Sequence, residues 1–204
     1  WLIPGLIDAH VHLPTDGYFG QKLPTQIPDL SFDMQDITTP IIANGVTTVL
    51  DLNSTMETFG QKKAIEKGYI VGPRIALTSN INGDNGQGKI ANTAEEGRIM
   101  VRIAKAEGYD FIKLYSKLNI ETYNAIIDEA HKQGLKTIGH IPNAFEGKLE
   151  QAFVPHFGMV AHAEEFSKHS ENFSIEDAQK FAKLSKDNGT YLSPTLTTMV
   201  WIAN

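Results

Sequence analysis

The chain has 204 residues, of which 41% are hydrophobic and 21% are charged, a composition typical of a globular protein. It has no apolar run approaching the roughly 18 residues that a membrane span needs, and its formal net charge of −6 disfavours nucleic acid as a partner. Because the sequence contains no cysteine, disulfides and thiolate catalysis are excluded, and any metal site must use histidine and oxygen ligands.

The first predicted strand lies in residues 4–13 and ends in a pair of histidines. His10 and His12 are two residues apart, so on a strand they project from the same face. Two imidazoles held on a rigid strand can ligate one transition metal through neutral ring nitrogens. The same pattern also occurs in packed strands that bind no metal, so downstream residues must decide between the two.

The remainder of the chain alternates between predicted strands and helices. Two long loops rich in Gly, Pro and polar residues cover 14–31 and 80–92, and neither contains a phosphate-binding motif. The further predicted strands cover residues 46–52, 74–79, 109–115, 136–140, 158–162 and 191–193. The predicted helices cover residues 32–44, 58–67, 93–108, 119–134, 144–153 and 174–189, with another expected after Thr195.

This alternation predicts an α/β fold with a parallel sheet and right-handed crossovers. An open doubly wound sheet and a (β/α)8 TIM-type barrel both satisfy it. Polar residues stand at the carboxyl ends of many predicted strands, whereas a doubly wound sheet would gather its site at one switch point. We therefore predict a single domain over residues 1–204, a (β/α)8 barrel truncated after about seven strands.

Three further residues stand at the ends of neighbouring predicted strands. Lys113 lies between apolar residues, and a lysine is rarely placed in a buried strand without a partner. His140 and His162 each follow one strand–helix repeat later. Taken singly, each could be an ion-paired lysine or a hydrogen-bonded histidine. Together with His10 and His12, they predict one shared site.

Five segments resemble the amidohydrolase superfamily, in particular its imidazolonepropionase-like and prolidase-like members. They are PGLIDAHVHL, GVTTVLD, FIKLY, GHIP and VAHAEE, and the resemblance extends over essentially the whole chain. It implies a metal-dependent hydrolase that acts on an amide, cyclic amide or peptide-like C–N bond of a small-molecule substrate.

The resemblance also implies a ligand set. In such enzymes the two histidines after the first strand, here His10 and His12, bind the more buried metal. The lysine ending the fourth strand, here Lys113, is carbamylated by CO2 and bridges two metals. The histidines after strands five and six, here His140 and His162, bind the second metal. Zinc is the first expectation from the ligand types, with manganese or iron as alternatives.

Elementary chemistry accounts for these residue types. Burial favours the uncharged amine of a lysine, and an uncharged amine can react with CO2. The resulting carbamate is an anion with two oxygens, suited to two cations roughly 3.5–4 Å apart, and such cations activate water for attack on a carbonyl. Four further residues are candidates for supporting the ligands or lining the pocket: Asp8, Asp51, Tyr115 and Glu164.

The sequence departs from the family pattern at its C-terminal end. The family places a metal-binding, proton-shuttling aspartate after strand eight, so the catalytic residue is expected beyond residue 204. Asp177 and Asp187 fall within a predicted helix and are poor substitutes. The family's small β-sandwich is missing as well, and Trp1 enters a strand almost at once. We therefore expect a piece of a longer chain that is inactive by itself.

Two other functions remain open. One is a mononuclear, deaminase-like enzyme in which Lys113 is unmodified. The other is a catalytically incompetent barrel fragment, or a module that binds metal or ligand without chemistry. The composition is compatible with a homo-oligomer, and with either a cytoplasmic or a periplasmic or secreted location.

Overall fold

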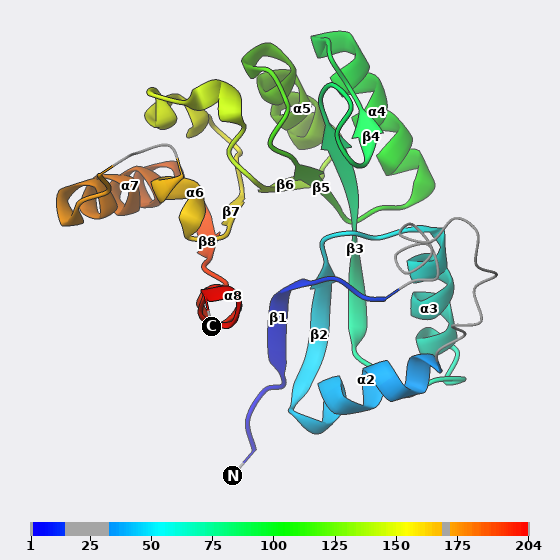
Figure 1. Ribbon diagram of the computed structural model, residues 1–204. Coiled ribbons are helices and arrows are strands. Elements are labelled where there is room, and N and C mark those ends of the chain that lie inside the picture. Colours follow the sequence, from blue (N-terminus) through cyan, green and yellow to red (C-terminus); the bar gives the residue numbers. More distant parts are fainter. Residues whose placement is uncertain (1, 15–32, 169–171, 204) are drawn as a thin grey trace, which may run out of the picture. The chain divides into compact units, whose positions relative to one another are not determined.

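The computed structural model describes residues 2–14, 33–168 and 172–203 (Figure 1). The chain divides into two compact units, Trp1–Thr78 and Ser79–Asn204. The predicted loop 14–31 lies almost entirely outside the described residues.

The described residues of the first unit form three parallel strands and two helices. Strand β1 pairs with β2, and β2 pairs with the beginning of β3, whose last residues belong to the second unit. The strands are β1 (Leu6–Val11), β2 (Val46–Asp51) and β3 (Arg74–Asn82). The helices are α2 (Met34–Ala43) and α3 (Met56–Glu66).

The second unit continues the alternation. Its strands are β4 (Lys89–Ile90), β5 (Phe111–Leu114), β6 (Lys136–Gly139), β7 (Met159–Ala161) and β8 (Tyr191–Ser193). Its α-helices are α4 (Ala94–Glu107), α5 (Ile120–Lys132), α6 (Glu164–Ser167), α7 (Ile175–Asn188) and α8 (Leu196–Ala203). Two 3-10 helices, η1 (Asn143–Phe145) and η2 (Leu149–Ala152), lie between β6 and β7.

The strand order confirms the predicted fold class. Neighbours in the sheet follow the order β1-β2-β3-β5-β6-β7-β8, with the short β4 paired to β3 outside this path. The order never reverses, as it would at the switch point of a doubly wound sheet. The fold is therefore α/β, with seven parallel strands in the order of a (β/α)8 barrel, and the described residues contain no β-sandwich.

Helices α4 and α7 begin where the sequence predicts. Thr93 accepts a hydrogen bond from the backbone N–H of Glu96, and Ser174 accepts one from Asp177. Each acidic side chain bonds back to the N-cap N–H, which completes a capping box. These contacts satisfy N–H groups that have no partner within the helix, so they fix the first turn.

Some predicted boundaries are wrong. Residues 144–153 form two 3-10 helices instead of one α-helix, because Gly147 has a φ of +70° that a helix does not continue. Strand β3 runs to Asn82, into the predicted loop 80–92, where β4 also lies. Helix α6 has only four residues, too few to show a helical period, and was not predicted.

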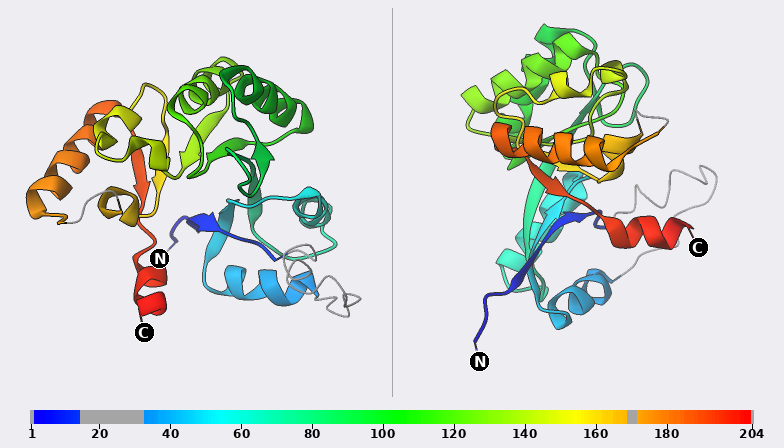
Figure 2. Two further views of the ribbon diagram at one scale, coloured as in Figure 1. Left: turned by 45° about the horizontal axis from the view of Figure 1, so that its top comes forward. Right: turned by 90° about the vertical axis from the view of Figure 1, so that its left-hand side faces the viewer.

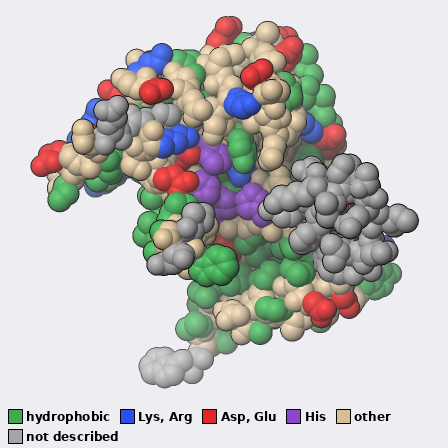
Figure 3. Space-filling model, viewed as in Figure 1, with side chains coloured by type: hydrophobic (Ala, Val, Ile, Leu, Met, Phe, Trp, Pro, Cys, Tyr) green, Lys and Arg blue, Asp and Glu red, His purple; other side chains and the backbone are tan. Residues whose placement is uncertain are grey.

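The core of the second unit is formed by its central strands and by helix α5. Ile112, Leu114 and Val160 are fully buried on the strands, and Tyr123 is fully buried on α5. Helices α4 and α5 lie side by side (Figures 1 and 2). Acidic and basic side chains both lie over the helices of this unit (Figure 3). Within the described ranges, no helix combines the length and apolarity needed to cross a bilayer.

Candidate metal centre

His10 and His12 lie together at the end of β1. Their Nε2 atoms are 3.3 Å apart, and the two rings are tilted by 36° with centroids 5.4 Å apart. Zinc binds an imidazole nitrogen at about 2.0–2.1 Å, so a tetrahedral ion would hold two such nitrogens about 3.3 Å apart. The observed separation therefore fits a pair of nitrogens that share one ion.

Two carboxylate side chains accept hydrogen bonds from the backbone around this pair. Asp8 Oδ1 accepts a hydrogen bond of 3.0 Å from the N–H of His10. Asp51, the last residue of β2, is fully buried, and its Oδ1 accepts bonds from the N–H groups of Leu13 (3.4 Å) and Asn53 (3.1 Å). Asp51 thus holds the backbone immediately after His12. Burial raises the pKa of the Asp51 carboxyl, although its hydrogen bonds act in the opposite direction.

Lys113, Tyr115, His140 and His162 form a second group, within the second unit. Lys113 is 1% exposed on β5, and its Nζ lies 5.1 Å from the centroid of the Tyr115 ring. The Tyr115 ring is 4.5 Å from that of His140, which in turn is 5.1 Å from that of His162. These side chains from the ends of β5, β6 and β7 therefore form a continuous row.

A close approach between strands sets the position of His140. The His140 N–H donates to the carbonyl of Leu114 at 3.0 Å, so the backbone remains attached to β5 beyond the end of β6. The preceding residue, Gly139, has a φ of +144°, and a Cβ there would lie 2.2 Å from the same carbonyl oxygen. Only glycine allows this approach.

Glu165 is the partner of His140, and the sequence did not single it out. Its side chain is 2% exposed, and Oε1 lies 2.6 Å from His140 Nδ1. Oε2 accepts from the Ile141 N–H at 2.7 Å and pairs with Lys168 Nζ at 2.5 Å. Burial acts to raise the pKa of Glu165, but the hydrogen bonds and charges of His140 and Lys168 outweigh it and lower that pKa below its usual value. Glu165 is therefore a carboxylate near neutral pH.

His162 is held at Nδ1 as well, by Thr195 Oγ1 at 2.8 Å. Both residues have left-handed backbones, with φ of +98° and +50°, a conformation that is strained for residues other than glycine. The His162 N–H donates to the carbonyl of Ser193 on β8, which helps to hold this conformation. Strain of this kind is common at functional sites. His140 and His162 therefore both have a hydrogen-bonding partner at Nδ1.

Tyr115 and Glu164 have different surroundings. Burial, together with the charge of Glu165, raises the pKa of the Tyr115 hydroxyl, so this residue remains a neutral phenol. Glu164, the first residue of α6, has a buried Oε2 with no hydrogen-bond partner among the described residues. The adjacent Glu165, and not Glu164, contacts His140.

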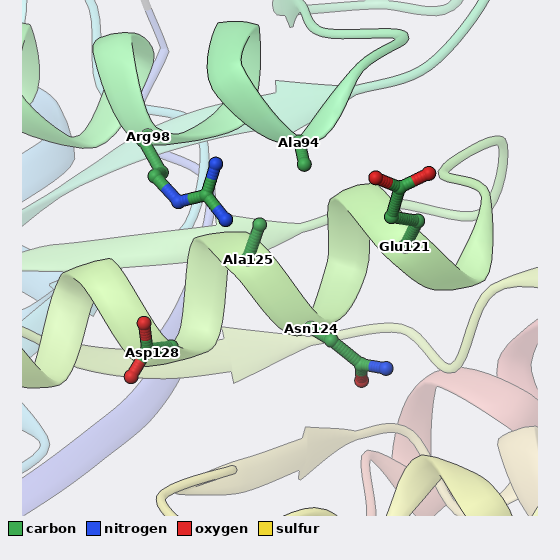
Figure 4. A pocket seen from close by; sticks show the side chains of 6 residues that line it. All are labelled: Ala94, Arg98, Glu121, Asn124, Ala125 and Asp128. Atoms are coloured by element: carbon green, nitrogen blue, oxygen red, sulfur yellow. The ribbon is translucent and has the colours of Figure 1, made fainter.

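A separate hollow of about 330 Å³ lies on the second unit, between α4 and α5. Its lining contains none of the predicted site residues and consists of Ala94, Arg98, Glu121, Asn124, Ala125 and Asp128 (Figure 4). Among residues 2–14, 33–168 and 172–203, no group of three or more histidine or carboxylate side chains is placed to hold a metal ion. Within the first unit the structure brings His10 and His12 together, and within the second it brings together Lys113, Tyr115, His140 and His162.

Comparison with known proteins decides the family. The model of the amidohydrolase family matches residues 1–203. The chain belongs to the amidohydrolase family. No curated protein matches this amidohydrolase significantly.

Solved structures share the fold of this amidohydrolase. A crystal structure of an uncharacterized protein has a TM-score of 0.70 and 21% identity, over 94% of this chain and 52% of that one. A Xaa-Pro dipeptidase with bound methionine has a TM-score of 0.66 and 22% identity, over 98% and 55%. The A. niger ochratoxinase has a TM-score of 0.65 and 20% identity, over 98% and 54%. The amidohydrolase chain therefore spans about half the length of these proteins.

Proposed function

We propose that the protein is a metal-dependent hydrolase of an amide, cyclic amide or peptide-like C–N bond in a small molecule. The family supports hydrolysis of the amidohydrolase type. The observation that carries the proposal is the row of Lys113, His140 and His162 at the ends of three successive strands of the second unit. In (β/α)8 barrels the carboxyl ends of the strands form the active-site face.

The residues of each group suit divalent metal. His10 and His12 would hold one ion, and their 3.3 Å Nε2 separation fits it. His140 and His162, whose ring centroids are 5.1 Å apart, would hold a second. Ions bound there, zinc in the first instance, would supply Lewis acidity toward a carbonyl and toward water.

Lys113 would be a metal ligand as a carbamate. The Lys113 side chain is 1% exposed, and the nitrogen of its uncharged form would bond to the carbon of CO2 while one proton leaves to solvent. The anion gains two oxygen donors, the ligand type that a buried amine lacks. Asp8 and Asp51 would hold the His10–His12 segment through its backbone.

In the overall reaction, the oxygen of water bonds to the carbonyl carbon, the C–N bond breaks, and the amine leaves with a proton derived from water. The Tyr115 phenol, next to His140, would donate a hydrogen bond to the substrate.

Hydrolysis assays of the full-length protein test this function. With zinc and bicarbonate supplied, we expect turnover within a panel of dipeptides, N-acyl amino acids and cyclic amides. His140→Ala should abolish that turnover. His131→Ala, at an exposed histidine of α5, is the matched control and should retain it. An inert wild-type protein across the panel, or an active His140→Ala variant, would contradict the proposal.

A mononuclear, deaminase-like enzyme is the second candidate. The Lys113 Nζ lies over the Tyr115 ring, a contact that suits an unmodified ammonium group. Carbon-13 NMR with labelled bicarbonate separates the two candidates. A carbamate signal that is present in the wild type and absent from Lys113→Ala supports the binuclear enzyme, and its absence from both supports the mononuclear one.

A further inference from the structure

Four asparagines of this chain are each followed by a glycine. They are Asn44, Asn82, Asn85 and Asn188. Asparagine is a chemically labile residue, and it reacts most readily before glycine, because a residue without a Cβ lets its nitrogen approach the side-chain carbonyl. The surroundings of these four asparagines therefore decide which of them reacts.

Two of the four are held at helix ends. The Nδ2 of Asn44, the C-cap of α2, donates to the carbonyl of Pro40 at 2.8 Å. The Nδ2 of Asn188, the last residue of α7, donates to the carbonyl of Val154 at 2.9 Å. Both side chains are fixed to backbone groups that keep them away from the following glycine nitrogen.

The third, Asn82, is protected by burial. It is 2% exposed, so water has little access to it. Its Oδ1 accepts hydrogen bonds from the N–H groups of Gly83 and Lys117, at 2.9 and 3.0 Å. The Gly83 nitrogen, which would have to attack, is therefore occupied as a donor to the oxygen.

Asn85 differs from the other three. It is an exposed residue of the loop between β3 and β4. The hydrogen bond that the structure shows for its side chain comes from Lys117, whose Nζ lies 2.6 Å from Oδ1. We propose that Asn85 is a site of spontaneous modification, at which the Lys117 ammonium activates the side-chain carbonyl toward attack by the Gly86 nitrogen.

The reaction consumes water and releases ammonia. The Gly86 nitrogen loses its proton to solvent and bonds to the side-chain carbonyl carbon of Asn85. The carbonyl oxygen gains a negative charge, which the Lys117 ammonium stabilises. The bond to the NH2 group then breaks, and this group leaves as ammonia with a proton from water. Water opens the resulting succinimide at either of its carbonyls, which gives aspartate or isoaspartate.

Packing within the loop requires the glycine. A Cβ on Gly86 would lie 2.0 Å from Asn82 Nδ2, and Asn82 is held in place by the two N–H groups that its Oδ1 accepts. The Gly86 N–H donates to the carbonyl of Gly83 at 3.1 Å, in a turn whose two central residues are exposed. Exposed turns of this kind open readily, which frees the nitrogen.

Incubation of the full-length protein in mildly alkaline buffer, followed by peptide mapping, tests the proposal. We expect aspartate and isoaspartate to accumulate at Asn85 before they appear at the other three asparagines, which serve as internal controls. Lys117→Met should slow the conversion about tenfold, because the developing oxyanion loses a charged hydrogen-bond donor. Lys117→Arg retains such a donor and should restore most of the rate. Lys132→Met, at an exposed lysine of α5 paired with Asp128, is the matched control and should convert like the wild type.

An Asn85 that stays intact while another of the four asparagines converts would overturn the assignment of the site. Conversion of Lys117→Met at the wild-type rate or faster would overturn the activation by Lys117. Neither result bears on the proposed hydrolase function, because the modification requires no metal and no substrate.

Discussion

At the scale of single residues, burial and backbone geometry constrain the candidate site more than local sequence does. Asp51 is fully buried, and its carboxylate accepts hydrogen bonds from the N–H of Leu13, next to His12, and from the N–H of Asn53. Gly139 allows a strand approach that no other residue tolerates. Each makes a prediction about stability that does not depend on metal.

Asp51→Asn should change the pH dependence of stability. Burial raises the pKa of Asp51 above its usual value of 3.8, so the folded protein keeps this proton to a higher pH than the unfolded chain does. The contribution of Asp51 to the free energy of unfolding therefore falls as pH rises from 3.8 through the raised pKa. Asparagine retains an oxygen acceptor and cannot ionise, so in urea unfolding between about pH 4 and 7 the stability of the variant relative to that of the wild type should rise with pH. An identical pH dependence in wild type and variant would contradict this.

Gly139→Ala should destabilise the protein by more than about 3 kcal/mol, because the new Cβ would lie 2.2 Å from the carbonyl oxygen of Leu114. Gly134→Ala is the matched control. Gly134 also has a positive φ, of +69°, but no atom of the described residues lies within 4 Å of the point that a Cβ would occupy, so a cost of about 1 kcal/mol is expected. If chemical unfolding showed an equal loss of unfolding free energy in the two variants, the close approach of Gly139 to β5 would not be what requires glycine.

At the scale of elements, the sequence predicts the long, regular segments well. The capping boxes that begin at Thr93 and Ser174 can be predicted from the sequence, because in each box the two residues are three positions apart. The parallel fold follows from the alternation of strands and helices. The four-residue helix α6 could not be predicted, because it is too short to show a period and is fixed by tertiary packing.

The same limit explains why Glu165 was missed. Two adjacent glutamates follow His162, and no local pattern distinguishes them. Their different roles depend on the orientation of α6, which is set by aromatic contacts with residues distant in sequence. A signal was present in the motif VAHAEE, but choosing between its two carboxylates required the three-dimensional structure.

Phe181→Ala tests the anchoring of α6. Phe181 is 6% exposed and stacks on Phe166, so its removal should lower the free energy of unfolding by about 3 kcal/mol. Hydrogen exchange of the α6 backbone should accelerate more than that of α5. Lys183→Ala, at an exposed residue on the same helix, should affect neither. A Phe181→Ala variant with wild-type exchange in α6 would show that other contacts hold this helix.

At the scale of the whole molecule, the family and the fold agree with the sequence-based expectation. The amidohydrolase model matches residues 1–203, and seven strands follow the barrel order. The ligand assignment of His10, His12, Lys113, His140 and His162 remains a prediction, as does the single domain over residues 1–204. The ligand assignment is supported by two groups of side chains, one at the end of β1 and one at the ends of β5, β6 and β7.

The metal content of the full-length protein, after equilibration with zinc and bicarbonate and removal of free ions, tests this assignment most directly. The wild type and the His131→Ala control should retain about two zinc ions per chain. His140→Ala and Lys113→Ala should each retain markedly less, because each removes a ligand of the second ion. Wild-type zinc content in both of these variants would contradict the assignment.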